Sequence, residues 1–150
     1  MQKFVAVLVF LCVPYVYAES IEGCYLVADE ITSFSSEESE IQATYVKIQG
    51  LLETTQLRGL FGGANFHVCH IASPIEGVGG PLQMNYVDNK LVYSHSEAEY
   101  SINCELEVSF KDNSLTIKDS NHHCSEYVFY CGARVGLDKV ELPKVAQECR

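Results

Sequence analysis

The chain has 150 residues and a formal net charge of −10, with 20 acidic against 10 basic side chains. This length suits a single domain with its own core. The negative charge disfavours a protein that binds DNA or RNA, because an acidic surface repels phosphates. Such a surface instead attracts cationic partners, or serves to keep an exported protein soluble.

The first residues have the three parts of a secretory signal. Lys3 gives a cationic start, residues 4–13 are apolar, and Val16 and Ala18 place compact side chains at the −3 and −1 positions of a cleavage point. The apolar run is shorter than the roughly 20 residues of a spanning helix, so an uncleaved anchor is the less favoured alternative. We therefore expect a signal peptide over 1–18, a single mature domain over 19–150, a periplasmic or secreted location and no membrane span.

Cleavage removes Cys12 and leaves six cysteines, Cys24, Cys69, Cys104, Cys124, Cys131 and Cys149. An even number in an exported chain predicts disulfides, because extracellular and periplasmic spaces are oxidising. Of the 15 pairings that six cysteines allow, we favour Cys124 with Cys131, which closes a short loop. The remaining pairs are then Cys69 with Cys104 and Cys24 with Cys149, the second of which would join the two chain ends.

Alternation of apolar and polar residues, with frequent turn signals, indicates short β-strands through most of the mature chain. We expect a first strand over 23–27 and a second over 43–52. The stretch between them, 29–41, is rich in Glu and Ser and predicts an acidic loop or a short helix.

Glycines mark the next hairpin. Strands are expected over 55–61 and 65–72, on either side of Gly62-Gly63-Ala64, because glycine adopts the positive φ of tight turns without steric cost. Residues 73–81 contain two prolines and three glycines and predict a loop.

The clearest strand of the sequence covers 102–110. Strands over 82–87 and 91–95, joined by the turn Asp88-Asn89-Lys90, are expected before it. In 102–110 the odd positions are polar and the even ones apolar, which is typical of a strand with one face in the core and one in solvent. The apolar face consists of Ile102, Cys104, Leu106, Val108 and Phe110.

After Asp112-Asn113, which predicts a turn, we expect a strand over 115–118 and the last strands over 127–131 and 134–137. Pro143 is expected to end the sheet. About eight antiparallel strands without long crossovers favour a meander closed into a small barrel, because closure removes exposed strand edges. The predicted fold is therefore an all-β, approximately eight-stranded barrel stapled by disulfides, with a two-sheet sandwich as the alternative.

No motif predicts catalysis or a bound cofactor. His67 and His122 lie near cysteines, but neighbours on a strand point to opposite faces and the cysteines are expected in disulfides, so we assign no metal. A nucleophile elbow is absent, and no glycine-rich loop leads into a helix. Acidic pairs such as Glu97 and Glu99 favour a charged solvent face over a glycosidase site. We predict a non-enzymatic protein.

The most distinctive run extends from Cys124 to Arg134. Two cysteines bracket an aromatic segment, and two small residues precede an arginine, whose planar donors suit carboxylates. The candidate binding residues are Tyr127, Tyr130, Arg134 and Asp138. The favoured alternative is that the aromatics pack in the core and that Arg134 pairs with a surface Asp or Glu.

This run resembles a motif of uncharacterised exported bacterial proteins, in which a cysteine and then Cys-Gly-Ala-Arg precede a strand. Two further segments, His67-Val68-Cys69 and Cys104-Glu105-Leu106, match the same proteins, so the resemblance covers roughly 43–143. By size, export, cysteines and expected barrel, these proteins are similar to the periplasmic lysozyme inhibitors, whose Ser-Gly-x-x-Tyr signature is absent here.

The architectural resemblance implies a non-enzymatic envelope protein that binds a cationic protein such as a lysozyme. An inhibitor of that kind would insert a loop, 73–81 or 121–131, into a cationic cleft. Two other functions stay open. One is a lipocalin-like carrier of a small apolar ligand, which needs a hollow barrel, and the other is a small envelope hydrolase, which needs a cleft with convergent titratable groups.

Overall fold

β-Strands form most of the regular structure. The computed structural model describes residues 20–32, 39–50, 54–73 and 79–149, so the signal peptide expected over 1–18 lies outside the described residues. Ten strands and three short helical turns are present in the described ranges. They are β1 (Gly23–Thr32), β2 (Ser39–Gln49), β3 (Gln56–Gly63), η2 (Ala64–Phe66), β4 (His67–Ile71), β5 (Leu82–Gln83), β6 (Asn85–Val87), β7 (Lys90–Glu97), η3 (Ala98–Tyr100), β8 (Ile102–Lys111), β9 (Ser114–Lys118), η4 (Cys124–Val128) and β10 (Glu141–Val145).

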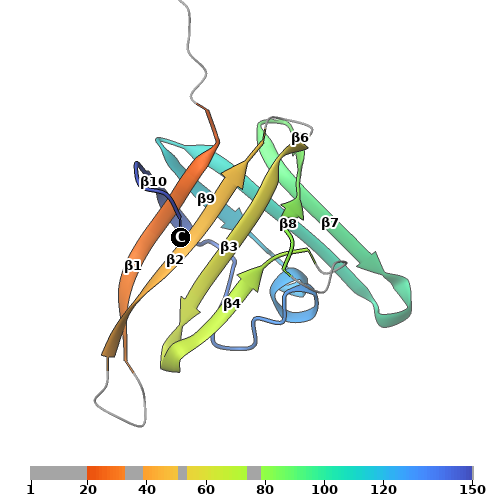
Figure 1. The fold of residues 1–150 in the computed structure, drawn as a ribbon. Helices are drawn as coiled ribbons and strands as arrows, with labels where there is room; N and C mark the ends of the chain where they lie inside the picture. The colour runs from red at the N-terminus through yellow and green to blue at the C-terminus, as the bar shows by residue number, and fades with distance from the viewer. Residues whose placement is uncertain (1–19, 33–38, 51–53, 74–78, 150) are drawn as a thin grey trace, which may run out of the picture.

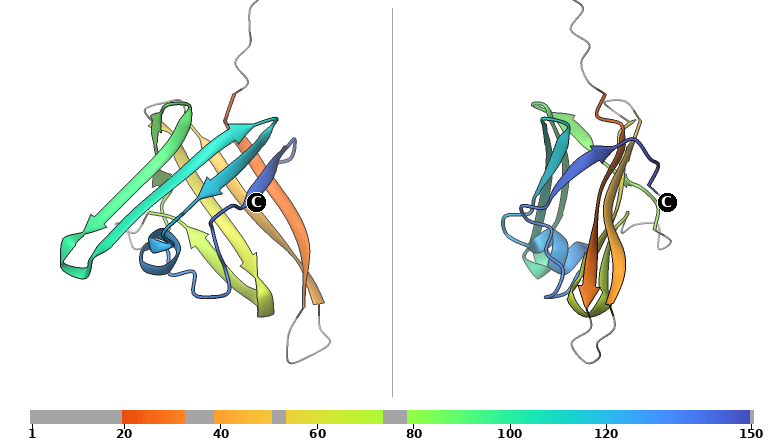
Figure 2. Two further views of the ribbon diagram at one scale, coloured as in Figure 1. Left: turned by 180° about the vertical axis from the view of Figure 1, so that it is seen from behind. Right: turned by 90° about the vertical axis from the view of Figure 1, so that its left-hand side faces the viewer.

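The strands pair in the antiparallel order β4-β3-β2-β1-β10-β9-β8-β7-β6, and β5 pairs with β3 outside this path (Figure 1). The sheet folds into two facing layers, one with β1 to β4 and the other with β6 to β9, as the right-hand view of Figure 2 shows. β10 crosses from one layer to the other, because it pairs with β1 at one end and with β9 at the other.

The sheet is a half-barrel, and the expected closed eight-stranded barrel is wrong. β4 and β6 stand at the two ends of the strand order and do not pair with each other. Strands were expected over 127–131 and 134–137, but the chain there forms the end of η4 and irregular backbone. Val128, Phe129, Val135 and Leu137 of these segments are buried in the core of the half-barrel instead. The all-β antiparallel fold is confirmed.

The core lies between the two layers and follows the predicted alternation. In β8, Cys104, Leu106 and Val108 are fully buried, while Glu105 is exposed. The inward side chains of both layers belong to one cluster of buried residues. Removal of this apolar surface from water is the main force that holds the layers together.

The turns of the second layer form where they are predicted. Asp88-Asn89 and Asp112-Asn113 each have φ values of 49° and 62°. Positive φ at both central residues identifies type I′ turns, whose twist matches that of the flanking strands. The hairpin at Gly62-Gly63-Ala64 also forms, with η2 within its turn.

Two local expectations are wrong. Residues 29–32 continue β1 and 39–41 begin β2, where an acidic loop or short helix was expected, because the two strands stay paired up to Thr32 and Ser39. Pro143 lies inside β10 and does not end the sheet. Lys144 donates its backbone N–H to Asn113 on the β9 side. Because neighbouring residues of a strand direct their backbone nitrogens to opposite sides, the nitrogen of Pro143 faces the β1 side. The pairing with β1 ends at Lys144, so no N–H donor is required at Pro143.

All six cysteines of the described chain form disulfides, in the pairs Cys24–Cys149, Cys69–Cys131 and Cys104–Cys124. The predicted link between the chain ends is confirmed. The predicted pairs Cys124–Cys131 and Cys69–Cys104 are wrong, because Cys69 and Cys104 lie in different layers and each bonds to one end of the 124–131 loop. Three disulfides indicate an oxidising, non-cytoplasmic compartment.

Candidate functional site

Residues 119–140, here called the plug, connect β9 to β10 and carry the candidate binding residues. Figure 1 shows η4, the helical turn of the plug, between β4 and β8. Disulfides fix both ends of this turn, since Cys124 bonds to Cys104 of β8 and Cys131 bonds to Cys69 of β4. The plug is therefore attached covalently to both layers of the half-barrel.

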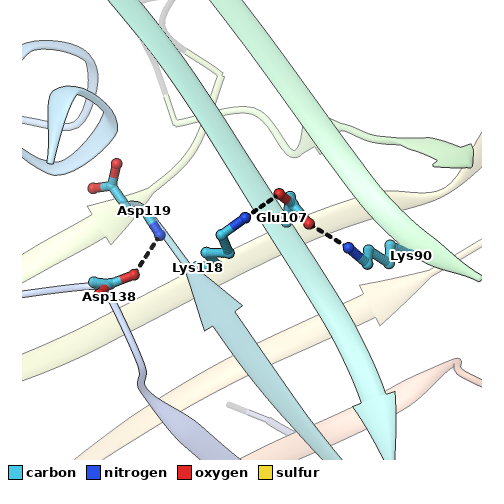
Figure 3. Close-up of polar contacts among 5 residues, drawn as sticks. All are labelled: Lys90, Glu107, Lys118, Asp119 and Asp138. Atoms are coloured by element: carbon cyan, nitrogen blue, oxygen red, sulfur yellow. Dashed lines mark hydrogen bonds and ion pairs between the residues drawn. The ribbon is translucent and has the colours of Figure 1, made fainter. Parts of the chain in front are cut away.

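Asp119 begins the plug and holds the first turn of η4. Its side chain is completely buried, and its carboxylate accepts the N–H groups of Cys124 at 3.2 Å and of Ser125 at 2.9 Å. The backbone N–H of Asp119 donates to a carboxylate oxygen of Asp138 at 2.9 Å (Figure 3). A carboxylate at the start of a helical turn satisfies N–H groups that have no partner within the helix. Asp119 thus acts as the cap of η4.

One side of the plug completes the core. Val128, Phe129, Val135 and Leu137 are buried, and the ring of Phe129 lies 6.1 Å from that of Tyr93 in β7. The β3–β4 hairpin meets the plug so closely that a Cβ on Gly63 would lie 2.5 Å from the carbonyl oxygen of Arg134. Glycine is required there for the close approach of two backbones.

The other side of the plug presents tyrosines to solvent. Tyr127 is 46% exposed and Tyr130 is 81% exposed. The ring of Tyr127 lies edge-on to His123 with the centroids 5.3 Å apart. Tyr130 has a positive φ of 52°, a conformation that costs a residue with a side chain about 1 kcal/mol or more. The expectation that the aromatics of this run pack in the core is correct for Phe129 and wrong for these two tyrosines.

The structure separates the other two candidate residues from the tyrosines. Arg134 is exposed, and its Nη1 lies 2.9 Å from Nε2 of His67, so the expected pairing with a surface Asp or Glu is wrong. Asp138 is engaged with the backbone of Asp119. Of the four predicted binding residues, Tyr127 and Tyr130 therefore share an exposed surface, Arg134 contacts the β3–β4 hairpin, and Asp138 has a structural role.

A network of charges that the sequence analysis missed lies on the outer face of the second layer. Glu107 of β8 bonds to Lys90 of β7 at 2.6 Å and to Lys118 of β9 at 2.7 Å (Figure 3). The hydrogen bonds from Lys118 and Lys90 hold the pKa of Glu107 below its usual value, and the bond to Glu107 raises the pKa of Lys118. Only the strand register reveals this cluster, because its members are far apart in sequence.

Beside this network the surface has a hollow of about 200 Å³. Its lining residues are Glu105, Glu107, Lys118, Ser120 and Asn121. A chain of contacts links the hollow to the exposed tyrosines: Asn121 donates to the carbonyl of Asn103 at 2.7 Å, and the N–H of Asn103 donates to Nδ1 of His123 at 3.0 Å. Hydrogen bonds therefore connect Asn121, at the hollow, to His123, which contacts Tyr127.

Comparisons with protein-family models, with curated proteins and with solved structures find no match. Within the described ranges, no group of three or more His, Cys, Asp or Glu residues could hold a metal ion. The same part of the chain contains no helix long and apolar enough to cross a membrane.

Proposed function

We propose that this protein is exported and binds a cationic protein, such as a lysozyme, without catalysing a reaction. The observation that carries the proposal is the disulfide-bracketed loop 124–131, which holds Tyr127 and Tyr130 in solvent. Tyrosine is enriched at protein interfaces because it offers a large contact area with little conformational entropy to lose. A loop fixed at both ends loses less freedom on binding than a flexible loop does.

The charge of the chain supports a cationic partner. Without the proposed signal peptide, nine Lys and Arg residues remain against twenty Asp and Glu, a formal charge of −11. Complementary charge accelerates association and disfavours anionic partners. A periplasmic or secreted location, which the disulfides support, would place the protein where lysozymes act.

The two alternatives receive less support from the geometry. A carrier of an apolar ligand needs a hollow interior, whereas the described inward side chains of both layers and of the plug form one buried cluster. A hydrolase needs titratable groups that converge with a substrate-sized cleft. The carboxylate of Glu107 in the outer hollow is already bonded to two lysines.

The proposal is tested by mixing the purified mature protein with lysozymes of several types and measuring the lysis of bacterial cell walls. We expect inhibition of at least one type, and weaker inhibition with Tyr127→Ala and Tyr130→Ala, by about tenfold or more if these tyrosines are central to the interface. Tyr100→Ala is the matched control. Tyr100 is 67% exposed but lies at the end of the β7–β8 hairpin, which projects away from η4 (Figure 1).

Unchanged lysis at micromolar excess of the protein over every lysozyme tested would refute the choice of lysozyme. Equal losses of inhibition in all three variants would refute the assignment of loop 124–131 as the recognition surface.

A further inference from the structure

Glu105 and Glu107 project from the same face of β8 but have opposite surroundings. Glu107 lies between two lysines from the neighbouring strands, and only 15% of its side chain is exposed. The cross-strand neighbour of Glu105 in β7 is Ser94, and Ser120 lies beside it beyond the end of β9. Serines are too short to cover a glutamate. The hollow therefore exists because long side chains surround one carboxylate and short ones surround the other.

Glu105 is consequently a carboxylate without a direct counter-charge. Among the described residues it forms no hydrogen bond or ion pair, and Lys118, which feels its charge, is bonded to Glu107 instead. The hollow thus presents an acceptor with free lone pairs, next to the hydroxyl group of Ser120. Its 200 Å³ is more than a single water molecule fills.

Tyr127 is connected to the hollow through a chain of contacting residues. Asn121, which lines the hollow, donates to the carbonyl of Asn103, and the N–H of Asn103 donates to His123, whose ring lies 5.3 Å from that of Tyr127. Aromatic rings attract cations at their faces, and arginine also stacks on them. A carboxylate without an ion pair beside a hydroxyl group fits a planar cation that carries several N–H donors.

We propose that this hollow receives an arginine side chain of the cationic partner, with the carboxylate of Glu105 accepting two N–H groups of the guanidinium. Arginine fits better than lysine because its fork of donors matches a carboxylate and because it is more weakly hydrated than an ammonium group. The inference rests on the proposed function, in that it takes the partner to be a cationic protein, but the hollow can be tested without that partner.

The test titrates the ¹⁵N-labelled mature protein with N-acetyl-arginine amide and follows the backbone amides by NMR. We expect shifts concentrated at Glu105, Ser120 and Asn121, with a dissociation constant of about 1–10 mM, the range for one small ligand group. N-acetyl-citrulline amide, an uncharged analogue of the same shape, should produce no saturable shift. N-acetyl-lysine amide should bind more weakly than the arginine compound.

Three variants make the test specific. Glu105→Gln should weaken arginine binding about tenfold or more, the loss expected for a hydrogen bond to a charged group. Glu141→Gln removes an exposed carboxylate of β10 outside the hollow and should leave the binding unchanged. Lys118→Gln should tighten the binding, because it removes a positive charge that lines the hollow and repels the guanidinium group.

Amide shifts elsewhere on the protein, equal binding of the citrulline compound, or equal effects of Glu105→Gln and Glu141→Gln would overturn the inference. The two proposals fail separately. If the Glu105→Gln variant inhibits a lysozyme as strongly as the wild type does, the arginine site is refuted but the proposed function is retained. If the hollow binds arginine but the protein binds no cationic protein, the proposed function is refuted but the arginine site is retained.

Discussion

Asp119→Ala is the substitution that most directly tests the account of the plug. The buried carboxylate accepts two backbone N–H groups, at 3.2 Å and 2.9 Å, and alanine would leave both without a partner. A hydrogen bond to a charged group contributes about 1.5–3 kcal/mol, and loss of a helix cap costs about 0.5–2 kcal/mol. Because the two bonds share one side chain and water can partly enter the vacated space, we expect a total destabilisation of about 2–4 kcal/mol.

The measurement is urea unfolding at pH 7 with the disulfides intact, followed by far-UV circular dichroism. A loss of this size should lower the urea midpoint by about 1–2 M, for the slopes typical of a domain of this length. Asp119→Asn is the matched control, since it keeps one acceptor oxygen and the side-chain volume. It should lose about half as much stability as the alanine variant does.

Local opening of the plug is distinguished by hydrogen exchange. The disulfides at Cys124 and Cys131 allow the plug to loosen while the sheet stays folded, in which case the urea midpoint would move little. The amide of Ser125, bonded to Asp119, should then exchange much faster in the alanine variant than in the wild type. An unchanged midpoint together with unchanged exchange at Ser125 would refute the role of Asp119 as the cap of η4.

Two further predictions concern the outer network and the β3–β4 hairpin. Since its lysine partners lower the folded-state pKa of Glu107, the stabilisation from this carboxylate is present above its ordinary pKa near 4.5 and is lost as the pH falls through the lowered value. Glu107→Gln should therefore be less stable than the wild type at pH 7, by under about 1 kcal/mol because the lysines are exposed. The gap in urea midpoint should narrow as the pH falls below the ordinary pKa of Glu107. An equal gap at pH 7 and at pH 3 would contradict this reasoning. Gly63→Ala should cost about 1–3 kcal/mol in urea unfolding, because the new methyl group collides with the backbone of the plug. Gly136→Ala is its control, as the added methyl group would meet nothing within 4 Å, and equal losses in the two variants would remove the steric explanation.

Alternation and turn residues were sufficient to predict most of the sheet. The 102–110 strand was found because its even positions enter the core and its odd positions face solvent, and both Asp-Asn turns follow from the tolerance of these residues for positive φ. The prediction of a loop or short helix over 29–41 was wrong for a physical reason. Strand pairing between β1 and β2 continues far beyond the core, so no apolar pattern marks it.

The plug could not be derived in the same way. Its aromatic run resembles a strand in composition, but the bonds that decide its conformation come from residues distant in sequence, such as Cys69 and Cys104. Asp119 accepts the first N–H groups of η4 from five residues before Cys124, whereas His123 occupies the N-cap position, so the usual local signal of a helix start is absent. The hollow at Glu105 depends on which side chains lie opposite it in the neighbouring strands, and that register is a property of the folded sheet.

The plug combines the features that a preorganised binding surface needs. A single helical turn is marginal by itself, because nucleation fixes several residues for one hydrogen bond. Asp119 and the two disulfides supply the missing stability, so the exposed tyrosines are not required to pack against the core. Tyr130 in particular keeps a positive φ while most of its side chain faces solvent, and its conformation is therefore maintained by its neighbours rather than by any burial of its own. The proposal that this loop recognises a partner rests on these two tyrosines, which the fold holds in solvent in a loop fixed at both ends.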